Sequence, residues 1–285
     1  MNFIASILNS ISEPGFLLAA ALGAIIAATI YHFSRRTRAK LAQLVIERDA
    51  KEKLLDEMRK LEKFRRDFIS NLTHEIRTPL TGILGAVELL SDDESLSTAD
   101  RIEMLKILKN ESVRLDKLAQ DILALARLEH TSDEAKRAFA ICNLADVLKN
   151  VFTLMKPKAA TAGIGLVLLK NENVKTACDA TLIEEALLNL IENALRYSGS
   201  LTIGLSLESL GGHAKITVSD NGIGIDKKHQ SRIFERFYRV DKARSREKGG
   251  TGLGLAIVKH IAQLHGGEVS LKSSPGKGCA FTIIL

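Results

Sequence analysis

Hydrophobic and polar positions follow three successive patterns along the chain. Residues 16–33 (FLLAAALGAIIAATIYHF) are almost wholly apolar, a length that just spans a bilayer as a helix. Residues 39–72 are rich in charge, and their apolar residues recur at a roughly heptad spacing that Arg65 interrupts, which predicts a coiled coil. After residue 139, short apolar runs alternate with amphipathic stretches, which predicts a mixed α/β domain.

The helical pattern continues past residue 72 and folds back on itself. Apolar residues at helical spacing extend to Leu90, and the segment SDDESLSTAD then supplies turn and cap residues before a second helix. The inner face of that helix is predicted to contain Leu105, Leu108, Leu115, Ala119, Ile122 and Ala126. One antiparallel hairpin has too small a core to stand alone, so two chains are expected to pair as a four-helix bundle, which makes the protein a homodimer.

The α/β domain is expected to have an order of elements that is not repeated βαβ. We expect strands near 139–142, 164–169, 201–208 and 213–219, helices over 143–161, 179–197 and 253–265, a long loop before the last helix and a final hairpin. A doubly wound parallel sheet is therefore not expected.

These patterns predict a membrane-anchored protein of class α plus α/β. It has an N-terminal transmembrane helix, a coiled-coil linker and a helical hairpin that forms a dimeric four-helix bundle, followed by an α/β sandwich. The expected segments are a short extracytoplasmic N-terminus (1–15), the transmembrane helix (16–33), the linker (34–63), the hairpin domain (64–131), a hinge (132–138) and the α/β domain (139–285).

Charge beside the apolar segment favours a retained anchor over a cleaved signal peptide, which is the alternative. A signal peptide needs a basic region before its apolar core, but no Lys or Arg precedes Pro14. Basic residues instead crowd the other flank, at Arg35, Arg36, Arg38 and Lys40. The positive-inside rule then puts the C-terminal domains in the cytoplasm.

Composition and charge narrow the classes of function. Of the 285 residues 46% are hydrophobic, enough for about two domains with real cores. The three cysteines are odd in number, far apart and without CxxC spacing, which favours a reducing compartment over a disulfide framework and predicts no metal site built from them. The net charge of +6 is concentrated in residues 226–248. That basic segment fits a phosphate-bearing ligand, and without a nucleic-acid motif no direct nucleic-acid binding is expected.

The segment SNLTHEIRTPL places His74 on the solvent side of its helix, about 200° from the apolar seam. A neutral imidazole can attack a phosphoryl group, and the adjacent Glu75 can accept the other ring proton. Thr78 shares the face of His74, and Pro79 is expected to kink or loosen the helix. The alternative is a surface histidine of no consequence.

This segment resembles the phosphoacceptor box of bacterial sensor histidine kinases of two-component systems, and the similarity extends over about residues 60–285, with four further boxes in order. The resemblance implies that His74 is phosphorylated from ATP and that Glu75 assists it. Thr78 matches the family threonine that orients water when phosphate is removed from the partner protein. The implied partner is the receiver domain of a response regulator.

The segment LIEEALLNLIENALRYS places Asn189 and Asn193 on one helical face, with Arg196 or Tyr197. Such a face suits phosphates and a hydrated Mg²⁺, although a solvated polar face is the plainer explanation. It resembles the family's N box, which implies that Asn193 binds Mg²⁺, Arg196 reaches phosphate and Tyr197 lies by the nucleotide.

Three later segments complete the resemblance. DNGIGI resembles the first glycine box, which implies that Asp220 accepts the adenine amino group beside Gly222 and Gly224. IFERFYRVD resembles the phenylalanine box, with Phe234 and Phe237 as anchors and Arg239 directed at phosphates. GGTGLGLAIVKHIA resembles the second glycine box, whose predicted nucleotide-binding residues are Gly250, Thr251, Gly252, Leu253 and Gly254. A dinucleotide fingerprint is disfavoured there, because no strand precedes it.

Together the boxes predict the ATP-binding fold shared by histidine kinases, gyrase, Hsp90 and MutL-type proteins, with ATP and Mg²⁺ bound. The predicted protein is a single-pass kinase of the bacterial inner membrane that transfers phosphoryl groups from His74 to a response-regulator aspartate and also acts as its phosphatase. One alternative is an ATPase or chaperone-like machine, but Asn189 replaces the glutamate that activates water in those relatives. The other is a pseudokinase scaffold, which the intact boxes disfavour.

Overall fold

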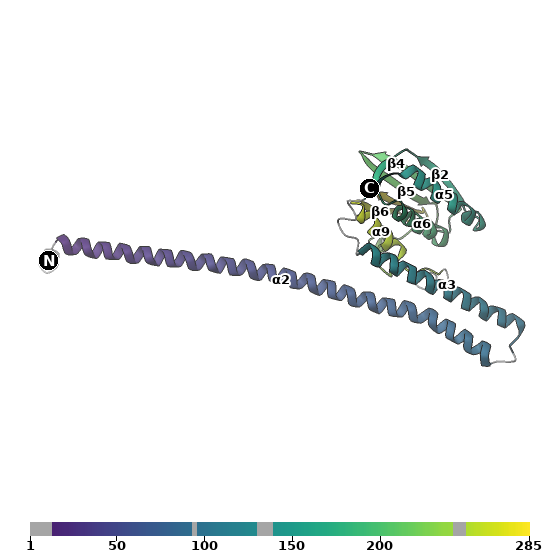
Figure 1. Ribbon diagram of the computed structural model, residues 1–285, viewed down its shortest axis with the longest axis horizontal. Helices are drawn as coiled ribbons and strands as arrows, with labels where there is room; N and C mark the ends of the chain where they lie inside the picture. Colours follow the sequence, from purple (N-terminus) through teal and green to yellow (C-terminus); the bar gives the residue numbers. More distant parts are fainter. Residues whose placement is uncertain (1–12, 93–95, 130–138, 242–248) are drawn as a thin grey trace. The chain divides into compact units, whose positions relative to one another are not determined.

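The computed structural model describes residues 13–92, 96–129, 139–241 and 249–285 (Figure 1). The chain divides into two compact units, Met1–Asp67 and Phe68–Leu285. The predicted hinge, most of the N-terminal segment before the apolar helix, and the basic stretch 242–248 lie outside the described residues.

The first unit consists of the N-terminal part of helix α2, which runs over Glu13–Asp92. Within it, Gly15–Arg38 has a mean hydropathy of 2.0 and is long and apolar enough to cross a membrane. This stretch contains the predicted transmembrane segment. Its side chains are unburied in the chain, as a helix surrounded by lipid would require.

The second unit begins with the predicted helical hairpin, formed by the end of α2 and by α3 (Thr98–Glu129). Ser97 starts α3, because its hydroxyl oxygen accepts the backbone N–H of Asp100 at 3.2 Å. Pro79 is buried and lies inside α2, so it does not end the helix.

Within the single chain, the buried face of α3 differs from the stripe that is predicted to face the interior of a two-chain bundle. Its buried residues are Arg114, Leu118, Asp121, Leu125 and Leu128, whereas Leu105 and Ala119 are exposed. The buried stripe faces α2 and the α/β domain of the same chain. The predicted stripe is left partly exposed, as are Ile76, Leu80 and Leu84 on α2.

The α/β domain follows the predicted order of elements, with one additional strand and one additional short helix. Its elements are β1 (Ala140–Asn143), α5 (Leu144–Thr161), β2 (Gly165–Asn171), β3 (Lys175–Cys178), α6 (Ala180–Tyr197), β4 (Thr202–Leu210), β5 (His213–Asp220), α7 (Lys227–Gln230), α9 (Gly254–Leu264), β6 (Glu268–Ser273) and β7 (Cys279–Ile284).

Five strands form one mixed sheet in the order β2-β4-β5-β7-β6, and three helices, α5, α6 and α9, cover it (Figure 1). Among these strands only β2 and β4 pair in parallel. Alternate residues of β4, including Ile203, Leu205 and Leu207, are fully buried. The α/β class and the absence of a doubly wound sheet are therefore confirmed.

Two polar side chains fix where the first two long helices of the sandwich begin. Asn143 accepts the backbone N–H of Ala145 at 3.2 Å, and Asp179 accepts those of Thr181 and Leu182 at 2.9 and 3.2 Å. These caps satisfy N–H groups that a helix leaves unpaired. The cap of α6 matters for function, because it sets the register of the helix that bears Asn193 and Arg196.

The expectation that the cysteines form no disulfide was wrong. Cys142 and Cys178 are joined by a disulfide, and Cys279 is a buried free thiol. The pairing could not be predicted from the sequence, because the two cysteines are 36 positions apart and strand β3 was not predicted. Antiparallel pairing of β1 with β3 brings them together, with Cα atoms 6.2 Å apart.

We expect Leu187→Ala to lower the free energy of unfolding by about 2–5 kcal/mol, because Leu187 is fully buried between α6 and the sheet and a cavity would remain. Urea unfolding followed by circular dichroism measures the change. Leu154→Ala on α5, where the side chain is 65% exposed, is the control and should change stability little. Equal losses in the two variants would contradict this packing.

Candidate functional site

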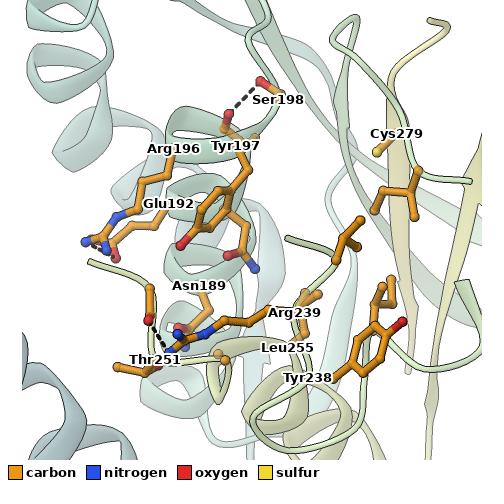
Figure 2. Close-up of a pocket in the computed structure, with 18 of the residues that line it drawn as sticks. Asn189, Glu192, Arg196, Tyr197, Ser198, Tyr238, Arg239, Thr251, Leu255 and Cys279 are labelled. Carbon is orange, nitrogen blue, oxygen red and sulfur yellow. Dashed lines mark hydrogen bonds and ion pairs between the residues drawn. The ribbon is translucent and has the colours of Figure 1, made fainter. Parts of the chain in front are cut away.

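A cavity of about 420 Å³ opens between α6, the β5 and β7 strand ends and the segment before α9, and Lys117 and Asp121 of α3 also line it (Figure 2). Many residues predicted for nucleotide binding line it: Asn189, Asn193, Arg196, Tyr197, Asp220, Gly224, Arg239, Gly250, Thr251, Gly252 and Gly254. Gly222 and Leu253 lie behind this lining. The structure thus gathers segments that are far apart in the chain around one cavity.

Helix α6 supplies one wall of the cavity. Arg196 lies 3.5 Å from the Glu192 carboxylate and donates a 3.1 Å hydrogen bond to the carbonyl oxygen of Gly249 (Figure 2). Asn189 is buried and donates to the Glu185 carbonyl at 3.0 Å, so its amide is engaged within its own helix. Asn193, one turn later, also lines the cavity.

Glycines are required where backbone segments meet around the cavity. A Cβ on Gly222 would lie 2.1 Å from the Ser198 carbonyl oxygen, and one on Gly224 would lie 2.0 Å from that of Ser274. Gly252 has a φ of +77°, and its Cβ would lie 2.9 Å from the Cα of Phe237. Side chains would therefore push these loops apart and alter the cavity.

The predicted phenylalanine anchors hold the segment that follows α7. Phe237 donates its backbone N–H to the Gly252 carbonyl at 2.8 Å. Phe234 packs edge-on against Phe281 of β7, with ring centroids 6.3 Å apart. These contacts fix Arg239, two residues beyond Phe237, beside the glycine loop.

Asp220 and Tyr197 are among the titratable groups in the wall whose pKa values are shifted. Burial raises the pKa of the Asp220 carboxyl, while the backbone N–H groups of Gly222 and Cys279 lower it. The hydrogen bond from Gly222 is 2.9 Å long. Burial also raises the pKa of Tyr197, against the effect of the Arg196 and Arg239 charges. The cavity lining thus combines the carboxylates of Asp121, Glu192, Asp220 and Asp241 with the cations Lys117, Arg196 and Arg239.

Arg239 is the cation most removed from water, since its side chain is only 5% exposed. It donates to the Gly250 carbonyl oxygen at 2.5 Å and to Glu75 Oε2 at 2.8 Å. Burial lowers the pKa of its guanidinium, and Glu75 opposes that shift. Its Nε is buried and has no hydrogen-bond partner among the described residues.

The hairpin brings its candidate residues to the edge of this site. His74 is exposed, as predicted, and its backbone carbonyl accepts the Thr78 hydroxyl at 3.1 Å. Glu75 points instead to Arg239 and to Arg114 of α3, whose Nη2 lies 3.1 Å from Oε2. Within the described residues, no hydrogen bond joins the Glu75 carboxylate to the His74 ring.

Several further contacts join the hairpin to the α/β domain. The Thr251 hydroxyl donates to Asp121 of α3 at 2.5 Å, and Lys117 lies 3.2 Å from the same carboxylate. The Phe68 and Phe237 rings lie 5.6 Å apart. Sequence reasoning missed Arg114, Lys117 and Asp121. The sequence did contain a sign of the buried pair Arg114 and Asp121. They alternate with Leu118 and Leu125 at helical spacing, so all four lie on one face of α3.

The two parts of this site define the class of protein. Residues 64–131 match the family model of the His Kinase A (phospho-acceptor) domain, and residues 178–285 match that of the histidine kinase-, DNA gyrase B- and HSP90-like ATPases. The chain belongs to the bacterial sensor histidine kinases of two-component systems, as the resemblance of its motifs predicted.

Curated relatives agree with this assignment. The chain is 36% identical over 228 residues to the sensor-like histidine kinase SenX3 of Mycolicibacterium smegmatis, an alignment that covers 79% of this chain and 58% of the relative. It is also 36% identical to the phosphate regulon sensor protein PhoR of Pseudomonas aeruginosa, over 78% of this chain and 50% of that protein. The chain thus spans about half the length of these relatives.

Solved structures share the arrangement of the elements. The histidine kinase AdeS of Acinetobacter baumannii superposes with a TM-score of 0.59 at 25% identity, covering 74% of this chain and 96% of AdeS. Full-length ShkA in complex with AMPPNP superposes with a TM-score of 0.54 at 28% identity, covering 76% of this chain and 45% of ShkA. ThkA in complex with the response regulator TrrA superposes with a TM-score of 0.59 at 23% identity, covering 77% of this chain and 60% of ThkA. At this identity, the superposition shows that the two proteins share a fold and no more.

We expect Thr251→Val to lower the free energy of unfolding by about 1–3 kcal/mol, because the buried Asp121 carboxylate would lose a hydrogen bond. Thr153→Val is the matched control, since the Thr153 hydroxyl is exposed and bonds only a carbonyl of its own helix. Urea unfolding compares the two variants. A Thr251→Val protein as stable as the wild type would show that this contact contributes nothing.

Proposed function

We propose that this protein phosphorylates itself on His74 with ATP and Mg²⁺ and passes the phosphoryl group to an aspartate of a response regulator. The observation that carries the proposal is the ion pair between Glu75 and Arg239. It places an arginine of the candidate nucleotide site against the acid adjacent to the candidate phosphoacceptor.

The cavity fits a nucleotide in size and chemistry. Its volume of about 420 Å³ lies within the range of small-molecule sites. The Asp220 carboxylate is suited to the adenine amino group, and Arg196 and Arg239 are suited to phosphates. The two arginines in the lining and the close-packed glycines support an anionic ligand lying against the backbone. ShkA, a structural relative, was solved with the nucleotide analogue AMPPNP.

Asn193 is the residue that would hold Mg²⁺. Mg²⁺ keeps several waters and takes few protein ligands, so one amide oxygen beside the phosphates is sufficient. When bound, the ion neutralises phosphate charge during transfer. Asn193 lines the cavity on the same helix as Arg196, which supports this assignment.

In the proposed reaction, Arg239 exchanges Glu75 for phosphate. Its guanidinium is bound to Glu75 and to the Gly250 carbonyl, so it cannot at the same time bind phosphate with the same N–H groups. When phosphates take Arg239, Glu75 becomes available to His74. Glu75 would then accept the proton of one ring nitrogen while the other ring nitrogen attacks the phosphoryl group.

Transfer to histidine is favoured over hydrolysis by water. Asn189 stands where the hydrolytic relatives carry a glutamate, and its amide is held by the Glu185 carbonyl. An amide cannot act as a base for water. This observation favours a kinase over the alternative of an ATP-driven machine.

The partners follow from surfaces of the hairpin. Exposed Ile76, Leu80, Leu84 and Leu105 give it an apolar face that a second copy would cover in a four-helix bundle. The exposed His74 face would receive the response regulator. ThkA, which shares the fold of this chain, was solved with such a regulator. Thr78 would support phosphatase activity after its hydroxyl leaves the His74 carbonyl.

The location of the protein is proposed to be the bacterial inner membrane. The apolar stretch Gly15–Arg38 would cross it once, with the basic flank and all later domains in the cytoplasm. The domain limits from the sequence, including 64–131 for phosphotransfer and 139–285 for ATP binding, are part of this proposal.

We expect His74→Gln to abolish self-phosphorylation and to leave nucleotide binding intact, because the nucleophile is lost and the cavity is unchanged. Asn193→Asp should lose both, since a carboxylate would face the phosphates. The assay follows label from γ-labelled ATP with Mg²⁺ and tests whether the label is acid-labile and alkali-stable, as phosphohistidine is. His213→Gln, at an exposed position on β5, is the control.

Three outcomes separate the candidate functions. Label that is present in His213→Gln and absent in His74→Gln supports the kinase and its acceptor. Release of free phosphate without protein label would support the ATPase alternative. A His74→Gln protein that still carries acid-labile label would refute the assignment of the acceptor.

A further inference from the structure

Two arginines bind the same oxygen of Glu75. Arg114 Nη2 lies 3.1 Å and Arg239 Nη2 lies 2.8 Å from Oε2. All three side chains are largely buried, with exposures of 7%, 5% and 14% for Arg114, Arg239 and Glu75. Among the described residues, no hydrogen bond or ion pair engages Oε1 of Glu75. The carboxylate is therefore held through one oxygen, while the other is left for a further donor.

The two arginines belong to different parts of the site. Arg239 follows α7 in the α/β domain and lines the cavity, so a nucleotide would compete for it. Arg114 is on α3 and faces α2 within the hairpin itself. Arg114 can therefore stay on Glu75 when Arg239 moves to phosphate.

The surroundings of Arg114 favour the arrangement in which its guanidinium binds Glu75. Its Nη1 lies 3.6 Å from Oε2 of Glu111, an atom that is buried and has no hydrogen-bond partner among the described residues. A buried guanidinium needs carboxylates nearby, and its two Nη groups here reach one acid each. The fork shape of arginine therefore sets the direction of the bond to Glu75.

We propose that Arg114 is a positioning residue for phosphoryl transfer to His74, an inference that rests on the proposed function. It holds Glu75 through Oε2 after Arg239 has left, and it leaves Oε1 free for the His74 ring. One ring nitrogen then forms its bond to the γ-phosphorus as the bond from that phosphorus to the ADP oxygen breaks. The electron pair of the broken bond leaves with ADP, and Glu75 takes the proton of the other ring nitrogen.

The test is a double-mutant cycle on the full chain, with self-phosphorylation measured at several ATP concentrations. We expect Arg114→Gln to lower kcat by about tenfold or more, because a misplaced acid no longer assists the nucleophile. The KM for ATP should change by less than about twofold, since Arg114 is not in the cavity lining. In a Glu75→Gln background, Arg114→Gln should cause no further loss.

Two further variants keep the test decisive. Arg114→Lys retains the charge and should recover part of the rate, and it replaces Arg114→Gln in the cycle if that variant does not fold. Arg101→Gln, an exposed arginine on the same helix, is the matched control and should behave as the wild type.

The results that would overturn the role of Arg114 differ from those that would overturn the function. An unchanged or raised kcat in Arg114→Gln, or an equal loss with and without Glu75, would overturn the positioning role while leaving the kinase intact. A wild-type chain that binds nucleotide but forms no phosphohistidine would overturn the proposed function, and the role of Arg114 with it.

Discussion

The ion pair between Glu75 and Arg239 is the interaction on which the arrangement of the site depends. Its members belong to the hairpin and to the α/β domain, and both side chains are almost shielded from water. A buried charge left without a partner costs several kcal/mol. Arg239 therefore needs Glu75 until a different anion replaces it, whereas Glu75 also has Arg114 as a partner. The anions that could replace Glu75 at Arg239 are the phosphates of a bound nucleotide. Binding of a nucleotide in the cavity would therefore break the ion pair between Glu75 and Arg239.

Hydrogen bonds to the glycine loop, residues 249–254, hold the surroundings of this ion pair in place. The Gly250 carbonyl accepts the same Arg239, Arg196 holds the Gly249 carbonyl, and Thr251 binds Asp121. The glycine loop is thus fixed by three side chains from three different elements. Its own conformation requires glycine, as the positive φ of Gly252 and the contact with Phe237 show. Movement of this loop would disturb the contacts of both the cavity and the hairpin.

Local rules predicted the elements of the fold, because their signals lie within a few residues. Asn143 and Asp179 marked helix starts, and the apolar face of α6 gave its orientation. The pairing of Cys142 with Cys178 could not be predicted, since it depends on β3, a four-residue strand without a clear pattern. The face of α3 that is buried within the single chain was not predicted, for a related reason. Arg114 and Asp121 are charged, and their burial depends on partners that helical spacing alone does not reveal: Glu75 of α2 for Arg114, and the Thr251 hydroxyl, beside Lys117, for Asp121.

The motifs predicted which residues surround the cavity, but not which residues they contact. Glu75 follows His74 in the sequence, yet its carboxylate binds two arginines that lie 39 and 164 positions away. Asn189 lines the cavity, and its side-chain amide also donates to the Glu185 carbonyl of its own helix. The contacts of Glu75 arise from the packing of α2, α3 and the α/β domain, and no spacing within one segment encodes them.

The most direct test of the exchange at Arg239 is the affinity for AMPPNP with Mg²⁺, measured by calorimetry in a His74→Gln background so that no transfer occurs. Removal of the competing carboxylate in His74→Gln/Glu75→Gln should tighten binding by several-fold, because Arg239 no longer has to leave an ion pair. Glu111→Gln in the same background, which alters the acid beside Arg114 and not Arg239, should leave the affinity unchanged. Equal or weaker binding in His74→Gln/Glu75→Gln would contradict the account.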